Sequence, residues 1–358
     1  MKIQRYRHNV QKLFILGAGA SFALSAVKSR DGKPSRAVTP LDATFLNCLN
    51  SSKPSNGWRR RSIDLLQSDW LDGGPLLDHG LEQAIIKRVS QYDLLSALHP
   101  KRTKGKSENA KYLNHLSHLV TSYLINCKSN SSGSTRKFVN WLFPPGVEVA
   151  EYGNRVITFN YDTLLERPLI DRGVSRRKIY FDRLVAQQAD GTSRKADEKF
   201  VHPLILKLHG SVNWRCAQSD FESIVHGKAK ELGKITIWSD DKPCPDPEDS
   251  ISPLIIPPIP NKPITAASIF SHLWTTAYEY LHETTELIIV GYSCPPTDTL
   301  ARTMLTHFEN TKLNEISIVD PNPMALSSYR DMIPERITKR ARWTYYSDFR
   351  DYIDRVVN

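Results

Sequence analysis

Short apolar, β-branched segments recur along the chain, and each of them ends at a turn or a polar residue. Several are apolar at every position, which is typical of strands buried on both faces of a parallel sheet. Stretches with helical periodicity follow three of them, at 162–171, 297–310 and 324–332. This alternation predicts an α/β fold with helices on both faces of the sheet. The predicted strands are 12–16, 155–159, 204–208, 234–238, 254–256, 286–290 and 315–319.

The stretch between the first two strands has a different character. Apolar residues at helical spacing occupy 76–89 and 112–125, and no convincing strand lies between them. We therefore predict a Rossmann-like, mostly parallel sheet with a helical insertion between its first and second strands. In this interpretation residues 1–41 and 150–358 form the Rossmann-like domain, and 42–149 form the helical insertion subdomain.

The charge balance is mildly basic. The chain has 358 residues, with 48 Lys and Arg against 38 Asp and Glu, a formal net charge of +10. Spread over this length, the excess favours a solvated basic surface, and the basic run at 101–106 is predicted to be a solvated loop. Contact with nucleic acid stays open as the alternative. The N-terminal segment has no signal-peptide pattern and no apolar run is long enough to span a bilayer, so we expect a cytoplasmic protein without a membrane partner.

The cysteines exclude several classes of protein. There are five, and no two lie within four residues of each other, which rules out paired CxxC zinc motifs and thioredoxin-type motifs. An odd and sparse count also argues against a secreted disulfide scaffold.

The first chemistry-bearing motif runs from the strand at 12–16 into Gly17-Ala18-Gly19-Ala20-Ser21. Glycine at positions 17 and 19 permits positive φ and close approach of a ligand, and the following helix offers N–H groups to a pyrophosphate. A tight turn without a ligand is the alternative. The third glycine of the dinucleotide fingerprint is replaced by Phe22, and no acidic residue ends a second strand near 33–40. An ordinary dehydrogenase is therefore disfavoured.

Two further motifs follow predicted strands. Asn160-Tyr161-Asp162 comes after the strand at 155–159, and His209-Gly210 comes after the strand at 204–208. Side chains at the carboxyl ends of parallel strands face the ligand crevice, although Asp162 is also suited to capping the next helix. Histidine, with an ordinary pKa of about 6.5, suits a base at neutral pH.

Together these motifs resemble those of the sirtuin-like family. Gly17–Ser21 matches its NAD-binding glycine segment, 158–162 its Asn-x-Asp motif, and His209-Gly210 its His-Gly motif. The segments 288–298 and 316–322 resemble its later Gly-Tyr/Thr-Ser loop and its final strand. The resemblance spans most of the chain and implies a Rossmann-like fold that binds NAD.

The departures narrow the expected activity. Deacylating sirtuins carry a four-cysteine zinc ribbon after the His-Gly motif, and here that region contains only Cys216 and Cys244. The chain most resembles the sirtuin-like branch of bacterial antiviral defence, whose members hydrolyse NAD to nicotinamide and ADP-ribose without a metal. The alternatives are an NAD-dependent deacylase or ADP-ribosyl transferase, and a subunit that senses NAD or ADP-ribose without turnover.

The resemblance implies roles for the site residues. Asn160 would orient the nicotinamide ribose or the attacking water, and His209 would act as general base. Asp162 would hold the nicotinamide end or fix the Asn160 loop. Asp298 is either a second polar anchor or, with Thr297, a cap for the helix near 300–308. The expected NAD-binding residues are Gly17, Ala18, Gly19, Ser21, Asp298, Asp320 and Asn322.

The resemblance also implies partners. A defence role requires a detector of the invader, and no second sensor domain is recognisable in the sequence. We therefore expect a separately encoded partner such as a HerA-type ATPase or a short Argonaute-type protein. Pairing of the amphipathic helices of the insertion between subunits would give a homo-oligomer, and packing of these helices on the chain's own sheet is the alternative.

Overall fold

The computed structural model describes most of the chain, in ten separate ranges. These ranges are 10–25, 57–68, 104–127, 133–147, 152–180, 203–228, 232, 235–239, 244–256 and 268–357.

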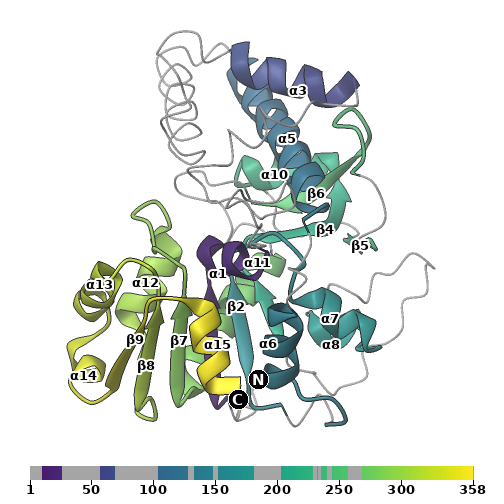
Figure 1. Ribbon diagram of the computed structural model, residues 1–358. Coiled ribbons are helices and arrows are strands. Elements are labelled where there is room, and N and C mark those ends of the chain that lie inside the picture. The colour runs from purple at the N-terminus through teal and green to yellow at the C-terminus, as the bar shows by residue number, and fades with distance from the viewer. Residues whose placement is uncertain are drawn as a thin grey trace, which may run out of the picture.

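The centre of the molecule is a six-stranded parallel sheet with the order β3-β2-β1-β7-β8-β9 (Figure 1). In β1, Ile15 lies opposite Ile157 of β2 and Ile289 of β7, and all three are almost fully buried. The α/β, Rossmann-like prediction is confirmed. The strands of this sheet are β1 (Lys12–Leu16), β2 (Arg155–Thr158), β3 (Ile205–Lys207), β7 (Glu286–Val290), β8 (Glu315–Val319) and β9 (Arg342–Tyr346).

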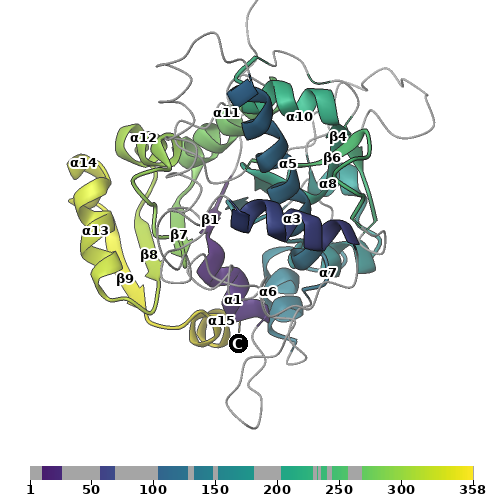
Figure 2. The ribbon, with the colours of Figure 1, turned by 90° about the horizontal axis from the view of Figure 1, so that it is seen from above.

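Helices cover both faces of this sheet, as the doubly apolar strands require. Figure 2 shows α6 and α15 on one face and α11 and α12 on the other. The Phe14 ring of β1 packs edge-on against Phe138 of α6 and Tyr352 of α15, which fixes these two helices against the sheet. The helices around the sheet are α1 (Ala18–Ser25), α6 (Ser134–Leu142), α7 (Glu166–Asp171), α8 (Arg176–Ile179), α11 (Ser268–Glu283), α12 (Thr299–His307), α13 (Met324–Met332), α14 (Glu335–Thr338) and α15 (Phe349–Val357).

A second, antiparallel sheet of three strands lies beside the first. Its order is β5-β4-β6, with β4 (Gly210–Ala217) in the middle, between β5 (Thr236–Ile237) and β6 (Ile251–Ile255). The chain turns into it at Gly210, where φ is +83° and a Cβ atom would lie 2.1 Å from the Leu254 carbonyl oxygen. The segments 234–238 and 254–256 were predicted as strands, and the strands that form there belong to this second sheet.

The described part of the helical insertion divides between the two sheets. Helix α5 (Lys104–Leu124) packs on β4, β6 and α10 (Gln218–Val225), and α3 (Gly57–Ser68) packs on α5. Helix α6 packs on the parallel sheet. No strand lies between β1 and β2 in the described ranges. The predicted domain boundaries at 41/42 and 149/150, and the predicted helix at 76–89, lie outside those ranges.

Other predicted elements differ in detail. The helix expected at 112–125 is the second half of α5, and 104–106 of the basic run are helical, so the prediction of a loop there is wrong. The helix expected from 162 begins only at Glu166, because a turn holds 162–165. The sequence patterns also missed β4 and β9. In the described part of the chain, no helix is long and apolar enough to cross a bilayer.

Candidate functional site at the carboxyl edge of the parallel sheet

The predicted site residues gather at one edge of the sheet. Because the six strands are parallel, their carboxyl ends meet there, and the strand order reverses between β1 and β7. Ligands of open α/β sheets bind at such a reversal point. Gly17 follows β1, Asn160 follows β2, His209 follows β3 and Asp320 follows β8. The topology therefore brings together residues that are far apart in the sequence.

The glycine turn after β1 packs against the turn after β7. A Cβ atom on Gly17 would lie 2.4 Å from the Gly291 carbonyl oxygen, and one on Gly19 would lie 2.8 Å from the Gly291 Cα. Of the three glycines in these two turns, Gly291 has positive φ, at +53°, and Gly17 and Gly19 do not, so they do not use the positive φ that the sequence analysis allowed them. The Gly17 and Gly19 amides donate to the carbonyls of Val290 and Gly291, each at 3.0 Å. Close backbone packing between two strand ends is what requires glycine here.

Asn160 ties the end of β2 to this turn. Its amide nitrogen Nδ2 donates to the Gly17 carbonyl at 2.7 Å and to the Ser21 hydroxyl at 2.8 Å, and its backbone N–H donates to Thr158 Oγ1 at 3.1 Å. Both amide hydrogens are used in this way. The carbonyl oxygen Oδ1 of the half-buried side chain is therefore the part of the group that can accept a hydrogen bond from a ligand.

Asp162 is buried in the turn that follows. Its Oδ1 accepts the Leu164 N–H at 3.1 Å, so the expected capping role applies to the turn before α7. Its second oxygen, Oδ2, is buried and has no hydrogen-bond partner in the structure. Since buried polar atoms are normally paired, Oδ2 is a candidate contact for a ligand group.

A buried ion pair holds this turn in place, and the sequence patterns did not indicate it. Lys207 of β3 donates to Glu166 Oε1 at 3.0 Å and also to the Asp162 carbonyl. Burial raises the pKa of Glu166, and the neighbouring Lys207 charge opposes this shift. Tyr180 also donates to Glu166 Oε1, at 3.2 Å. One signal was present in the sequence, since Lys207 is the lone charge in an apolar strand.

His209 lies in a network with Asp298 and Tyr292. His209 Nε2 is 3.5 Å from Asp298 Oδ1, and the Tyr292 hydroxyl donates to Asp298 Oδ2 at 2.7 Å. Both His209 and Asp298 are about 5% exposed or less. Burial, and then the Asp298 charge, raise the pKa of Tyr292 well above its usual value, so this hydroxyl stays protonated. Asp298 stands at the start of α12 without a side-chain capping bond, so its expected role as a cap is wrong.

Aromatic rings enclose this network. The Phe159 ring stacks on Tyr292 with the ring centres 4.1 Å apart and lies 5.1 Å from the His209 ring. Trp274 of α11 lies 6.2 Å from His209 on another side. Neither Phe159 nor Trp274 was among the predicted site residues. They form an apolar wall beside His209.

At the end of β8, the predicted site residues bond to the backbone of their own loop. Asp320 is half-buried, burial raises its pKa, and its Oδ1 accepts the Asn322 N–H at 2.8 Å. Asn322 is exposed, and its Oδ1 accepts the Met324 N–H at 3.1 Å at the start of α13. The two side chains thus shape the loop after β8. Their predicted contacts with an adenosine remain predictions.

Within the described ranges no group of three His, Cys, Asp or Glu side chains could hold a metal ion. The four cysteines found there, Cys127, Cys216, Cys244 and Cys294, are buried, and Cys48 lies outside those ranges. Cys294, with φ +46°, is the non-glycine residue of positive φ in the described chain. It belongs to the loop between β7 and α12 that holds Tyr292 and Asp298.

A family model described as a SIR2-like domain matches residues 154–344, just over half of the chain. The match begins just before β2 and ends within β9, so it includes Asn160, His209, Asp298 and Asp320. The glycine turn at 17–21 precedes it. A search of curated proteins found no match.

Proposed function

The chain belongs to the SIR2-like family, and from that premise we propose that it hydrolyses NAD⁺ to nicotinamide and ADP-ribose. SIR2-like domains are NAD-utilising, and the particular reaction is our proposal. The observation that carries it is the buried His209–Asp298 pair at the carboxyl edge of the sheet, where His209 packs against Phe159, the residue before Asn160. This arrangement offers a positioned base and a positioned amide, which hydrolysis of a glycosidic bond requires.

The carboxyl edge of the sheet suits a dinucleotide through the charge of a helix N-terminus and through its hydrogen-bonding groups. The N-terminus of α1 carries partial positive charge that favours a pyrophosphate. The Gly17 and Gly19 amides already donate to backbone carbonyls. We therefore assign the phosphate contact to the start of α1 and to Ser21. The Ser21 hydroxyl accepts from Asn160, which leaves its own hydrogen for a phosphate oxygen. Asp320 would accept from the adenosine ribose hydroxyls.

The bond to be broken joins the nicotinamide nitrogen to C1′ of the ribose. Water attacks C1′, nicotinamide leaves as a neutral base, and His209 takes the proton from the water. Asp298 stabilises the positive charge that His209 gains and fixes the orientation of its ring, as a carboxylate does in a catalytic triad. A base placed in this way contributes on the order of 10²–10⁴ in rate.

Asn160 and Asp162 would orient the reacting groups. Asn160 Oδ1 is positioned to accept from a ribose hydroxyl or from the water, because Nδ2 is held by Gly17 and Ser21. Asp162 Oδ2 is a buried acceptor on the same loop. Groups held in advance of the reaction in this way lower the cost of ordering the transition state.

We further propose that this activity depletes NAD during bacterial antiphage defence in the cytoplasm. The support is the resemblance to the defence branch of the sirtuin-like family. A separately encoded partner such as a HerA-type ATPase or a short Argonaute-type protein would supply the trigger, and the active form would be a homo-oligomer. Co-purification with the products of the flanking genes tests the partner.

The test of the reaction is NAD consumption by the full chain, with nicotinamide and ADP-ribose quantified. Asn154 and Asn160 lie at opposite ends of β2, and Asn154 Nδ2 donates to the Leu142 carbonyl. We expect Asn160→Ala to abolish turnover and the matched control Asn154→Ala to retain it. Equal turnover by the two variants would contradict the assignment.

The same assay separates the alternatives. Formation of an acylated ADP-ribose from NAD, when an acyl-lysine peptide is added, would indicate a deacylase. A mass increase on a target protein would indicate a transferase. NAD that is bound but recovered intact, with each partner candidate present, would indicate a sensing subunit.

A further inference from the structure

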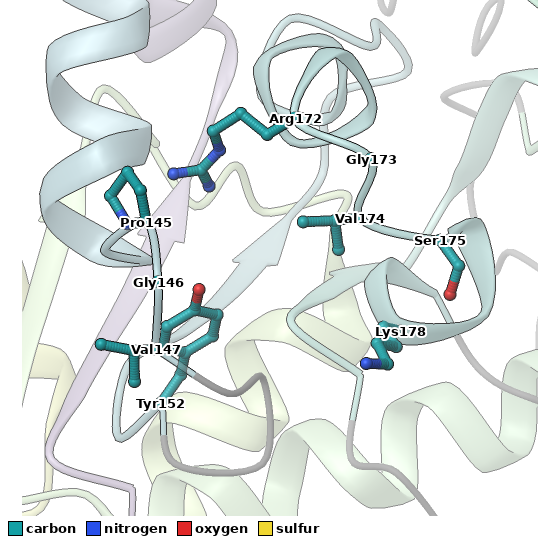
Figure 3. A pocket seen from close by; sticks show the side chains of 9 residues that line it. All are labelled: Pro145, Gly146, Val147, Tyr152, Arg172, Gly173, Val174, Ser175 and Lys178. Carbon is teal, nitrogen blue, oxygen red and sulfur yellow. The ribbon is translucent and has the colours of Figure 1, made fainter.

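A cavity of about 560 Å³ opens at the opposite edge of the parallel sheet, at the amino end of β2 (Figure 3). It lies between the segment that leads from α6 to β2 and the turn that joins α7 to α8. Asn160 follows the carboxyl end of β2, so this cavity and the candidate catalytic site are at opposite ends of one strand. A ligand held here would not be the substrate of that site.

Arg172, the residue that follows α7, lines this cavity. Only part of its guanidinium group is hydrogen-bonded. One nitrogen, Nη1, donates to Asn140 Oδ1 at 3.0 Å and to the Phe143 carbonyl at 2.9 Å. The other two, Nε and Nη2, are buried and have no hydrogen-bond partner. Among the described residues no carboxylate forms an ion pair with Arg172. The Nε–Nη2 edge is the fork that binds two oxygen atoms of one anion, and leaving it buried and unpaired is costly.

The rest of the lining adds positive charge and an apolar wall. In Figure 3 the Lys178 ammonium points into the hollow from α8, and the Tyr152 hydroxyl points into it from the other side. The Tyr152 hydroxyl donates to the Pro144 carbonyl at 2.8 Å, which fixes its ring. Val147 and Val174 supply apolar surface, and none of the described lining residues is acidic.

We propose that this cavity binds a small organic phosphate, a phosphate ester with a compact apolar or aromatic body. A guanidinium fork and an ammonium group match the charge and geometry of a phosphate dianion. Binding requires a rotation of the Arg172 side chain, because Nε and Nη2 are buried in the structure as it stands. The Tyr152 ring and the two valines accommodate the apolar body. The volume is within the range of small-molecule sites.

The test is titration calorimetry of the full chain with phenyl phosphate, inorganic phosphate and phenol as probes. We expect saturable one-to-one binding of phenyl phosphate, weaker binding of inorganic phosphate and none of phenol. Lys178→Gln should weaken phenyl phosphate by about tenfold or more, which corresponds to about 1.4 kcal/mol. The matched control is Lys228→Gln, since Lys228 is also exposed and lies on another part of the surface. Equal affinity of the two variants, or no saturable binding, would overturn the proposal.

Three further variants distinguish the possible outcomes. Arg172→Gln should also lose binding, and its melting temperature must be measured because Arg172 anchors the end of α6. The sequence between Val147 and Tyr152 contains Glu148 and Glu151. Binding that appears only in a Glu148→Gln, Glu151→Gln double variant would mean that the chain's own carboxylates occupy the cavity, and this outcome would also overturn the proposal. His209→Ala should bind phenyl phosphate as the unchanged protein does, so the test does not depend on the proposed catalysis.

Discussion

The carboxyl edge of the parallel sheet and the interior of the small antiparallel sheet both bury polar side chains, and they use them in different ways. His209 is 5% exposed and pairs with the carboxylate of Asp298 at a strand end. His118 of α5 is fully buried, and its Nδ1 lies 2.9 Å from the Pro245 carbonyl. Arg215 of β4 is also fully buried and donates to the Val212 and Trp214 carbonyls.

The partners are what distinguish the two regions. At the sheet edge, side chains that follow different strands pair with one another, as Asn160 does with Ser21 and His209 with Asp298. In the small sheet most of them bond to peptide carbonyls and hold loops against α5. Burial of a titratable group is therefore weak evidence of function, and its pairing with other side chains at a strand end is stronger evidence. Four predictions test this comparison.

The largest effect on stability is expected where the two strand ends touch. Gly17→Ala places a Cβ atom 2.4 Å from the Gly291 carbonyl oxygen and 2.6 Å from the Tyr292 Cα, and backbone atoms cannot move aside easily. We expect a loss of about 3 kcal/mol or more in the free energy of unfolding. Gly173→Ala is the control, because Gly173 has φ +80° and open space around it, and it should cost only about 1–2 kcal/mol. Urea unfolding measures both, and equal losses would show that the contact between the strand ends is not tight.

The second prediction concerns pH and the small sheet. Burial is the main cause that lowers the pKa of His118, to about 4 from 6.5. The unfolded chain therefore takes up a proton at this residue as the pH falls below 6.5, and the folded chain does so only near pH 4. The stability due to neutral His118 is complete above pH 6.5 and is lost towards pH 4. Between about pH 7.5 and about pH 5 this amounts to about 2 kcal/mol.

The comparison with His118→Asn checks this pH effect. We expect the variant to lose less stability over the same pH interval, by about 2 kcal/mol, in urea unfolding at the two pH values. Identical pH dependence of the variant and the unchanged protein would mean that His118 is not the titrating group.

The third prediction concerns the carboxylate next to His209. Asp298→Asn keeps the shape of the side chain and removes its charge, and we expect kcat for NAD to fall by about 10- to 100-fold with KM nearly constant. Tyr292→Phe removes only the hydroxyl that donates to Asp298 and should cost a few-fold. Steady-state kinetics measure both. A change confined to KM would indicate that Asp298 contacts the substrate and does not position His209.

The smallest effect is expected at the end of β8. Asn322→Ala removes the acceptor of the Met324 N–H and should lower stability by about 1 kcal/mol. Thermal unfolding measures this loss. A raised KM for NAD in the same variant would show that Asn322 also contacts the nucleotide.

The sequence patterns located the most deeply buried strands of the parallel sheet accurately. The ranges of β1, β7, β8 and α13 were predicted to the residue, because apolar runs between turns leave little choice. The strand β9, with its half-exposed Trp343, Tyr345 and Tyr346, lacks such a run and was missed. So was β4, because Ser211, Asn213 and Arg215 are rare in buried strands. The partners of Ser211 and Asn213, Tyr161 and Tyr180, are distant in the sequence, so no local pattern indicates them.

Individual site residues could be predicted from the sequence, and the contacts between them could not. Strand-end positions identified Asn160 and His209, since topology alone brings these together. The pairing of His209 with Asp298 depends on how the loop after β7 folds back, and the sequence favoured capping of the next helix as the role of Thr297 or Asp298. The glycines at 17 and 19 were singled out for positive φ and for the close approach of a ligand. They have no positive φ, and the close contact that the structure shows is with the backbone of Gly291. Their close neighbour, Gly291, lies more than 270 positions along the chain, where no local pattern indicates it.

The central claim is that His209, and not a comparably buried histidine elsewhere, performs the chemistry. The direct test is NAD turnover by His209→Ala and His118→Asn, with the folded fraction of each measured by circular dichroism. We expect a loss of about 10²–10⁴ in kcat for His209→Ala in a folded protein, and turnover per folded molecule within about twofold for His118→Asn. Unchanged turnover by folded His209→Ala, or an equal loss in both variants, would contradict it.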